Sequence, residues 1–98
     1  EGRMDFLDTS VLKKLISNDQ IPLQYVNSKG QATEKYPANP NGSPEGISSI
    51  CSKDGRATIL MPHPERAFLN KQLSWTDGDD SDSSPWFEMF LNARKFVN

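Results

Sequence analysis

The stretch GISSICSKDGRATILMPHPE, residues 46–65, reads as two short strands, a turn between them and a stiff segment after them. Residues 46–52 and 57–61 are rich in β-branched and apolar side chains, and the Asp54-Gly55 pair between them is typical of tight hairpin turns. Pro62 ends the second strand because it has no N–H to donate to the ladder. We therefore predict an antiparallel hairpin, with His63 just past a strand's carboxyl end, where open α/β sheets carry their chemistry.

His63 is the only histidine of the chain, and it lies between Pro62 and Pro64. A proline pushes the residue before it toward extended angles, so we expect this segment to be stiff and extended. Residues two apart in an extended chain project to the same side, which predicts that His63 and Glu65 face one pocket. A carboxylate beside one ring nitrogen leaves the other nitrogen free as a base. The pattern predicts the base and the orienting acid of a nucleophilic triad; a surface or structural histidine is the alternative.

Cys51 is the one candidate nucleophile within the chain. A nucleophile on a sharp strand-turn-helix elbow needs small residues, usually glycine, two positions before and two positions after it. Ser49 and Lys53 occupy those positions, so we predict that Cys51 is a structural thiol. A single cysteine also excludes an internal disulfide and fits a reducing compartment, and one Cys with one His makes no convincing zinc set.

Two amphipathic helices are predicted, one toward each end of the chain. Asp8 is expected to be the N-cap of the first helix, whose apolar stripe comprises Val11, Leu12, Leu15 and Ile16. Ser84 is expected to be the N-cap of the closing helix and Pro85 its first residue. The stripe of that helix comprises Trp86, Phe90, Ala93 and Val97.

The segments between these elements contain many turn residues. Residues 21–26 are predicted to form an edge strand, followed by a turn at 27–30 and a returning strand at 31–34. Residues 36–44 hold three prolines, which favour an ordered loop. Residues 74–84 are predicted to form an acidic surface loop.

Length and charge exclude several classes of protein. With 98 residues there is room for one small domain. No apolar run approaches the roughly 20 residues of a membrane span, and we expect no membrane partner. Eleven basic and thirteen acidic residues give a net charge of −2 without a basic stripe, so nucleic acid is not an expected partner.

Three motifs in order carry a family resemblance. They are Tyr-Pro-Ala-Asn-Pro-Asn-Gly-Ser-Pro-Glu-Gly-Ile at 36–47, Met-Pro-His-Pro-Glu-Arg at 61–66, and Ser-Pro-Trp-Phe with Asn-Ala-Arg-Lys over 84–95. Together they resemble the carboxyl end of the formylglycinamide ribonucleotide amidotransferases, also called phosphoribosylformylglycinamidine synthases. The likeness runs over nearly the whole chain, and residues 1–3, Glu-Gly-Arg, resemble the end of the family's His-Gly-Glu-Gly-Arg segment.

The resemblance implies an α/β fold, the flavodoxin-like class I glutamine amidotransferase domain. Residues 1–98 would be its carboxyl-terminal fragment, with two helices and several short, largely antiparallel strands. His63 would be the general base and acid, and Glu65 would orient it, as a cysteine attacks glutamine and ammonia is released. The ammonia would pass to a synthetase region of the same cytoplasmic enzyme, which uses ATP and magnesium to make formylglycinamidine ribonucleotide in purine synthesis. No cofactor or metal site is expected in this fragment.

Two departures from the family limit what the chain is expected to do alone. The Gly-x-Cys-x-Gly elbow of the family does not occur in the sequence, and the loop at 74–84 is more acidic than expected. The fragment alone should therefore be inactive, and its uncovered sheet edge and helix faces predict self-association. The alternative function is a small non-catalytic interaction module that binds a partner through the proline-rich loop.

Overall fold

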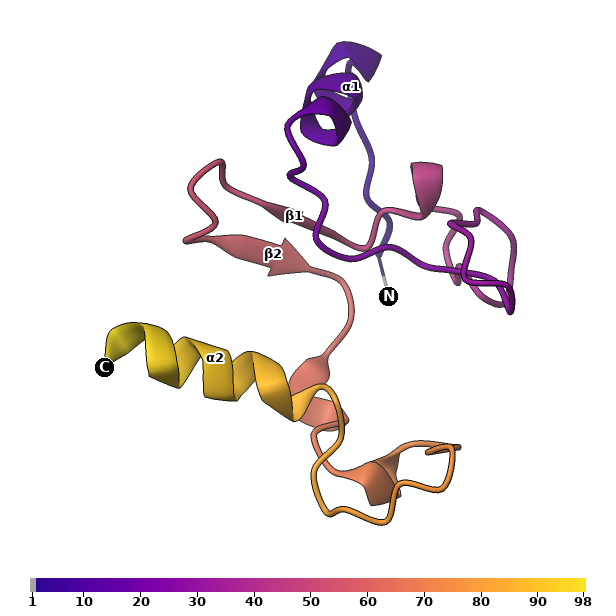
Figure 1. The fold of residues 1–98 in the computed structure, drawn as a ribbon. Helices are drawn as coiled ribbons and strands as arrows, with labels where there is room; N and C mark the ends of the chain where they lie inside the picture. The colour runs from indigo at the N-terminus through magenta and orange to yellow at the C-terminus, as the bar shows by residue number, and fades with distance from the viewer. Residues whose placement is uncertain (1) are drawn as a thin grey trace. The chain divides into compact units, whose positions relative to one another are not determined.

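The computed structural model describes residues 2–98 (Figure 1). They form two compact units, Glu1–Pro62 and His63–Asn98. The first unit contains the helix α1 (Thr9–Ser17), the short 3-10 helix η1 (Pro44–Gly46) and the strands β1 (Ser49–Cys51) and β2 (Thr58–Leu60). The second contains the 3-10 helices η2 (Pro64–Arg66) and η3 (Asn70–Gln72) and the helix α2 (Phe87–Val97). Two helices and a two-stranded antiparallel sheet are compatible with a fragment of an α/β domain.

The predicted hairpin is present, with shorter strands than expected. Ser49 pairs with Leu60, and Cys51 pairs with Thr58. The backbone N–H of Ser52 donates to the carbonyl of Ala57 (2.8 Å) and closes the turn around the Asp-Gly pair. The prediction of several strands was wrong for the described residues, because the other pairings are three isolated bridges.

Helix α1 begins where the sequence predicts. The carboxylate of Asp8 accepts a hydrogen bond from the backbone N–H of Ser10 (2.8 Å), which satisfies one of the free donors of the first turn. No residue of α1 is buried, and Val11 and Ile16 are almost half exposed. Leu12 and Leu15 are partly buried, so the apolar stripe is formed but only partly covered by the described residues.

Residues 21–34 do not form the predicted pair of strands. The turn at 27–30 is present, but beyond it only Val26 and Ala32 make a bridge. The segment instead lies along the approach to β1: the N–H of Tyr25 donates to Gly46 (2.6 Å), and the N–H of Ser48 donates to Leu23 (3.2 Å). The N–H of Tyr25 and the carbonyl of Leu23 are therefore bonded to distant residues and not to a returning strand at 31–34.

The interior of the first unit is mostly polar. Among the described residues, Ile47 is the one hydrophobic side chain that is fully buried. Asn39, 1% exposed, orders the proline-rich loop: its side-chain amide donates to the carbonyls of Thr33 and Ser43 (2.9 Å each), and its side-chain oxygen accepts from the N–H of Ser43 (3.1 Å). The expectation of an ordered loop at 36–44 is confirmed.

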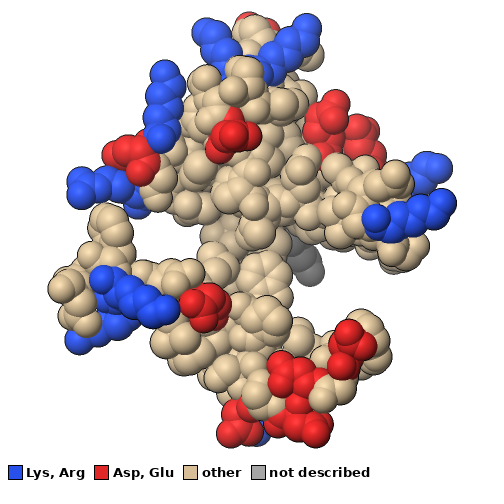
Figure 2. Space-filling model, viewed as in Figure 1, with Lys and Arg blue, Asp and Glu red and all other residues tan. Residues whose placement is uncertain are grey.

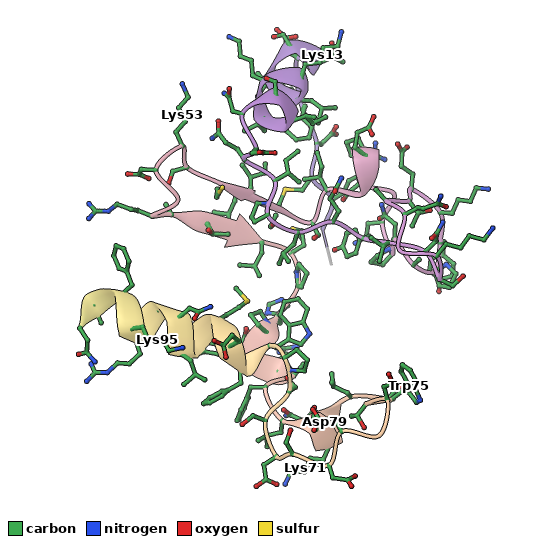
Figure 3. All side chains as sticks on the ribbon, in the orientation of Figure 1. Lys13, Lys53, Lys71, Trp75, Asp79 and Lys95 are labelled. Carbon is green, nitrogen blue, oxygen red and sulfur yellow. The ribbon has the colours of Figure 1, made fainter. Side chains whose placement is uncertain are left out.

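The acidic loop of the second unit is anchored at one residue. Asn70 is buried; its backbone N–H donates to Asp82 (2.9 Å) and its side chain donates to the carbonyl of Ser81 (2.7 Å). Acidic side chains gather over this loop (Figure 2). Trp75 is 76% exposed and extends from the loop (Figure 3), so the loop is a surface feature as predicted.

Helix α2 begins two residues later than predicted. Ser84 and Pro85 precede the helix, which starts at Phe87. The turn before it is of the 3-10 type, with hydrogen bonds between residues three apart, such as that from the N–H of Phe87 to the carbonyl of Ser84 (3.0 Å). The Ser84 hydroxyl still accepts from the N–H of Trp86 (3.2 Å). No residue of α2 is buried, and Phe90 is 43% exposed. In residues 2–98 no helix is long and apolar enough to cross a membrane.

Gly46 and Gly42 provide a matched test of the pairing at the centre of the first unit. Both have positive φ (69°), but a Cβ on Gly46 would lie 2.7 Å from the carbonyl oxygen of Tyr25, whereas a Cβ on Gly42 would meet nothing within 4 Å. We expect Gly42→Ala to lower the free energy of unfolding by about 1 kcal/mol and Gly46→Ala by about 3 kcal/mol or more. Urea denaturation measures both free energies of unfolding. An equal decrease in the two variants would contradict the importance of the close approach between Gly46 and the carbonyl of Tyr25.

Candidate active site

His63 and Glu65 are in direct contact. The ring nitrogen Nδ1 of His63 lies 2.9 Å from Oε1 of Glu65. Both side chains are 57% exposed, while Pro64 between them is buried. Pro64 therefore fixes the backbone in the interior, while the side chains of His63 and Glu65 face solvent.

A turn brings the two side chains together, not an extended segment. Residues Pro64–Arg66 form η2, closed by bonds from the N–H of Arg66 to the carbonyl of His63 (3.0 Å) and from the N–H of Ala67 to that of Pro64 (3.1 Å). The expectation of an extended chain was wrong beyond His63, since proline also fits the first position of a helix, where its missing N–H costs nothing. His63, the N-cap, does retain non-helical angles (φ −112°, ψ 83°).

The contact defines which ring nitrogen is available for chemistry. An ionised carboxylate only accepts hydrogen bonds, so Nδ1 of His63 must carry the proton that faces Glu65. In the neutral ring this leaves the lone pair on Nε2, the nitrogen that can act as a base.

The electrostatics of Glu65 agree with this assignment. The pKa of Glu65 lies below its ordinary value, chiefly because its carboxylate accepts the hydrogen bond from His63. A bond from its own backbone N–H lowers the pKa further, desolvation opposes the lowering, and attraction to His63 and Arg66 adds to it. The carboxylate is therefore ionised at neutral pH.

Cys51 belongs to the first compact unit, whereas His63 and Glu65 belong to the second. It is in β1, opposite Thr58, and its N–H donates to the carbonyl of Gln20 (3.0 Å) while its own carbonyl accepts from the side-chain amide of Gln20 (2.8 Å). These bonds hold it in regular extended backbone, not on an elbow, in agreement with a structural thiol. Residues 2–98 contain no group of three or more His, Cys, Asp or Glu side chains that could hold a metal ion.

The sequence interpretation missed the residues that support the pair. Glu65 lines a cavity of about 220 Å³ together with Phe68, Phe87 and Phe90. The Phe68 and Phe87 ring centroids are 6.3 Å apart, and those of Phe87 and Phe90 are 6.5 Å apart. The spacing of Phe87 and Phe90 on the closing helix was visible in the sequence, but nothing local linked Phe68 to them. A larger hollow of about 630 Å³ by the acidic loop includes neither His63 nor Glu65.

The chain matches a known protein family over almost its whole length. The family model described as the CobB/CobQ-like glutamine amidotransferase domain matches residues 1–97. The match thus covers both compact units and includes His63 and Glu65.

Removing His63 should alter the titration of Glu65. We expect His63→Ala to raise the pKa of Glu65 toward its ordinary value, because the largest cause of the lowering is removed. The stabilising effect of the contact is present above the ordinary glutamate pKa and is lost as the pH falls through the lowered value. Carboxyl ¹³C shifts of the chain of residues 1–98, followed against pH, measure this change.

Asp54 is the internal control for that titration. Its pKa is also lowered, but by the hydroxyl of Ser52, so it should titrate alike in both proteins. An unchanged midpoint for Glu65 in His63→Ala would show that the contact does not persist in solution.

Proposed function

Because the chain belongs to the family of CobB/CobQ-like glutamine amidotransferase domains, we propose that His63 and Glu65 are two members of a glutaminase triad. The family makes this an enzyme of the amidotransferase type with glutamine as its substrate. The observation that supports the catalytic roles is the contact between Nδ1 of His63 and Oε1 of Glu65 at 2.9 Å.

In the proposed reaction, Nε2 of His63 takes the proton of a cysteine thiol, and the thiolate attacks the side-chain carbonyl carbon of glutamine. A C–S bond forms, and His63 returns the proton to the amide nitrogen as the C–N bond breaks, so that ammonia leaves. A water molecule, deprotonated by His63, then cleaves the thioester to glutamate and restores the thiol. Glu65 orients the ring and stabilises the imidazolium at each transfer.

We propose that the nucleophile comes from a part of the enzyme outside these 98 residues, so that the fragment alone is inactive. Cys51 is bonded into a strand, and no Gly-x-Cys-x-Gly elbow occurs in the sequence. His63 and Glu65 are each more than half exposed, which leaves room for a further segment above them. Covering by that segment would exclude water and strengthen the contact between base and acid.

The motifs support a finer proposal. The Pro-His-Pro-Glu element, the proline-rich motif before it and the Ser-Pro-Trp-Phe motif after it resemble the formylglycinamide ribonucleotide amidotransferases. On that basis the domain is a flavodoxin-like class I glutaminase, and its ammonia serves the formation of formylglycinamidine ribonucleotide in purine synthesis in the cytoplasm.

ATP and magnesium would act in the synthetase region of such an enzyme. Residues 2–98 contain no group of three or more His, Cys, Asp or Glu side chains that could hold a metal ion, and we propose no step in this chain that uses ATP or magnesium. What this chain contributes to the reaction is the base and its orienting acid.

A non-catalytic interaction module has less support. Its best feature is Tyr36, 80% exposed in the proline-rich loop, but an exposed aromatic side chain alone does not identify a partner. The family match over residues 1–97 and the His63–Glu65 contact both favour the enzyme.

Substitution of His63 in the full-length enzyme tests the proposal. We expect His63→Ala to lower glutamine-dependent synthesis by about a thousandfold or more, because the variant lacks the proposed general base. Synthesis from added ammonia should remain close to that of the unsubstituted enzyme. Loss of both activities to the same extent would show that His63 is structural.

Glu65 allows a matched comparison with Glu88. Both side chains are 57% exposed and each makes one ion pair, Glu88 with Lys95 at 3.5 Å. We expect Glu65→Gln to lower glutamine-dependent turnover by about a hundredfold or more, because the imidazolium loses its counter-charge, while Glu88→Gln has little effect. Equal turnover in the two variants would contradict the orienting role of Glu65.

A further inference from the structure

Ser84 is a buried hydroxyl that links the start of α2 to the turn carrying the catalytic pair. It is 4% exposed, and its side chain donates to the carbonyl of Ala67 while accepting from the N–H of Trp86. Its backbone N–H donates separately to the carbonyl of Phe68 (2.8 Å). Two hydrogen bonds thus join Ser84 to Ala67 and Phe68, the first across a separation of 17 residues, and the third bond ties the same hydroxyl to Trp86.

Ala67 is the point at which this link reaches the turn. Its N–H donates to the carbonyl of Pro64 and closes η2, and its carbonyl receives the hydroxyl of Ser84. Both polar groups of one residue are therefore engaged, one by the turn and one by Ser84. Because Pro64 is also buried, the backbone from Pro64 to Ala67 is restrained on its inner side.

The restraint matters because the pair itself is exposed. His63 and Glu65 make one contact with each other, and neither is held by burial of its own side chain. The angle at which Nε2 of His63 faces a substrate is then set by the backbone of η2. A catalytic base displaced by about 1 Å loses up to a hundredfold in rate.

We propose that Ser84 is a positioning residue for the His63–Glu65 pair, acting through the carbonyl of Ala67. The hydroxyl fixes the orientation of η2 against the first turn of α2, and the aromatic contact of Phe68 with Phe87 supports the same junction. This inference rests on the proposed glutaminase function. It assigns to the Ser-Pro-Trp-Phe motif a role that its sequence position does not reveal.

The test is kinetic and uses the full-length enzyme. We expect Ser84→Ala to lower kcat of the glutamine-dependent reaction by about ten- to a hundredfold while the KM for glutamine stays within about twofold. Synthesis from ammonia should be unaffected. A wild-type kcat in Ser84→Ala would overturn the inference.

Ser49→Ala is the matched control. Ser49 is fully buried, and its hydroxyl accepts from the N–H of Leu23 (2.8 Å) and donates to the carbonyl of Leu23 (3.4 Å), so the variant loses a similar set of bonds. It should keep the wild-type kcat. An equal fall of kcat in the two variants would mean general destabilisation and would overturn the positioning role.

A second variant covers the case in which Ser84→Ala does not fold. Ser84→Cys is close in shape, but a thiol is a weaker donor and acceptor than a hydroxyl. We expect its kcat to fall between those of the unsubstituted enzyme and Ser84→Ala, and to be severalfold below the former if only this variant folds. A wild-type kcat in Ser84→Cys alone would count against the proposal.

Two measurements separate this inference from the proposed function. If His63→Ala retains glutamine-dependent synthesis, the proposed function fails whatever Ser84 does; if His63→Ala is inactive and Ser84→Ala is not impaired, only the positioning role fails. In the chain of residues 1–98, Ser84→Ala should raise the pKa of Glu65 toward its ordinary value, and Ser49→Ala should leave it unchanged. An unaltered Glu65 titration in Ser84→Ala would show that η2 keeps its geometry without the hydroxyl.

Discussion

Hydrogen bonding between residues 23–25 and residues 46–49 is the constraint on which the first unit depends. Tyr25 donates to Gly46, Ser48 donates to Leu23, and the hydroxyl of Ser49 joins both polar groups of Leu23. Apolar burial contributes little beside it, since Ile47 is the one fully buried hydrophobic side chain in the part of the chain described. Satisfied polar contacts therefore take the place of a packed core, and each unmade bond would leave a buried group without a partner.

Elements whose signals are local were predictable. The cap at Asp8, the Asp-Gly turn and the outline of the hairpin each follow from a few neighbouring residues. The conformation of residues 21–34 was not predictable, because Leu23 and Tyr25 bond to residues more than 20 positions away. The start of α2 was predicted two residues too early, because the chain after Ser84 first forms bonds between residues three apart, such as that from the N–H of Phe87 to the carbonyl of Ser84.

The sequence predicted which two residues of the candidate site lie together, but not the backbone conformation that brings them together. His63 and Glu65 do lie together, but through a 3-10 turn and not through alternation in a strand. A proline at position 64 fits both conformations, so spacing alone did not distinguish them. The support beneath the pair, Phe68 against Phe87 and Ser84 against Ala67, joins segments distant in sequence and was not predictable from either segment.

His63 and Glu65 are only two residues apart in sequence, which also affects the order in which parts of the domain fold. Closing a contact between residues two apart in sequence restricts very little chain, so its entropic cost is small compared with that of bringing the proposed distant cysteine to the same place. The side chains of His63 and Glu65 can meet as soon as the Pro-His-Pro-Glu segment forms its turn. If the proposed roles hold, the pair forms early as half of the site, and bringing the nucleophile to it is a slower, long-range step.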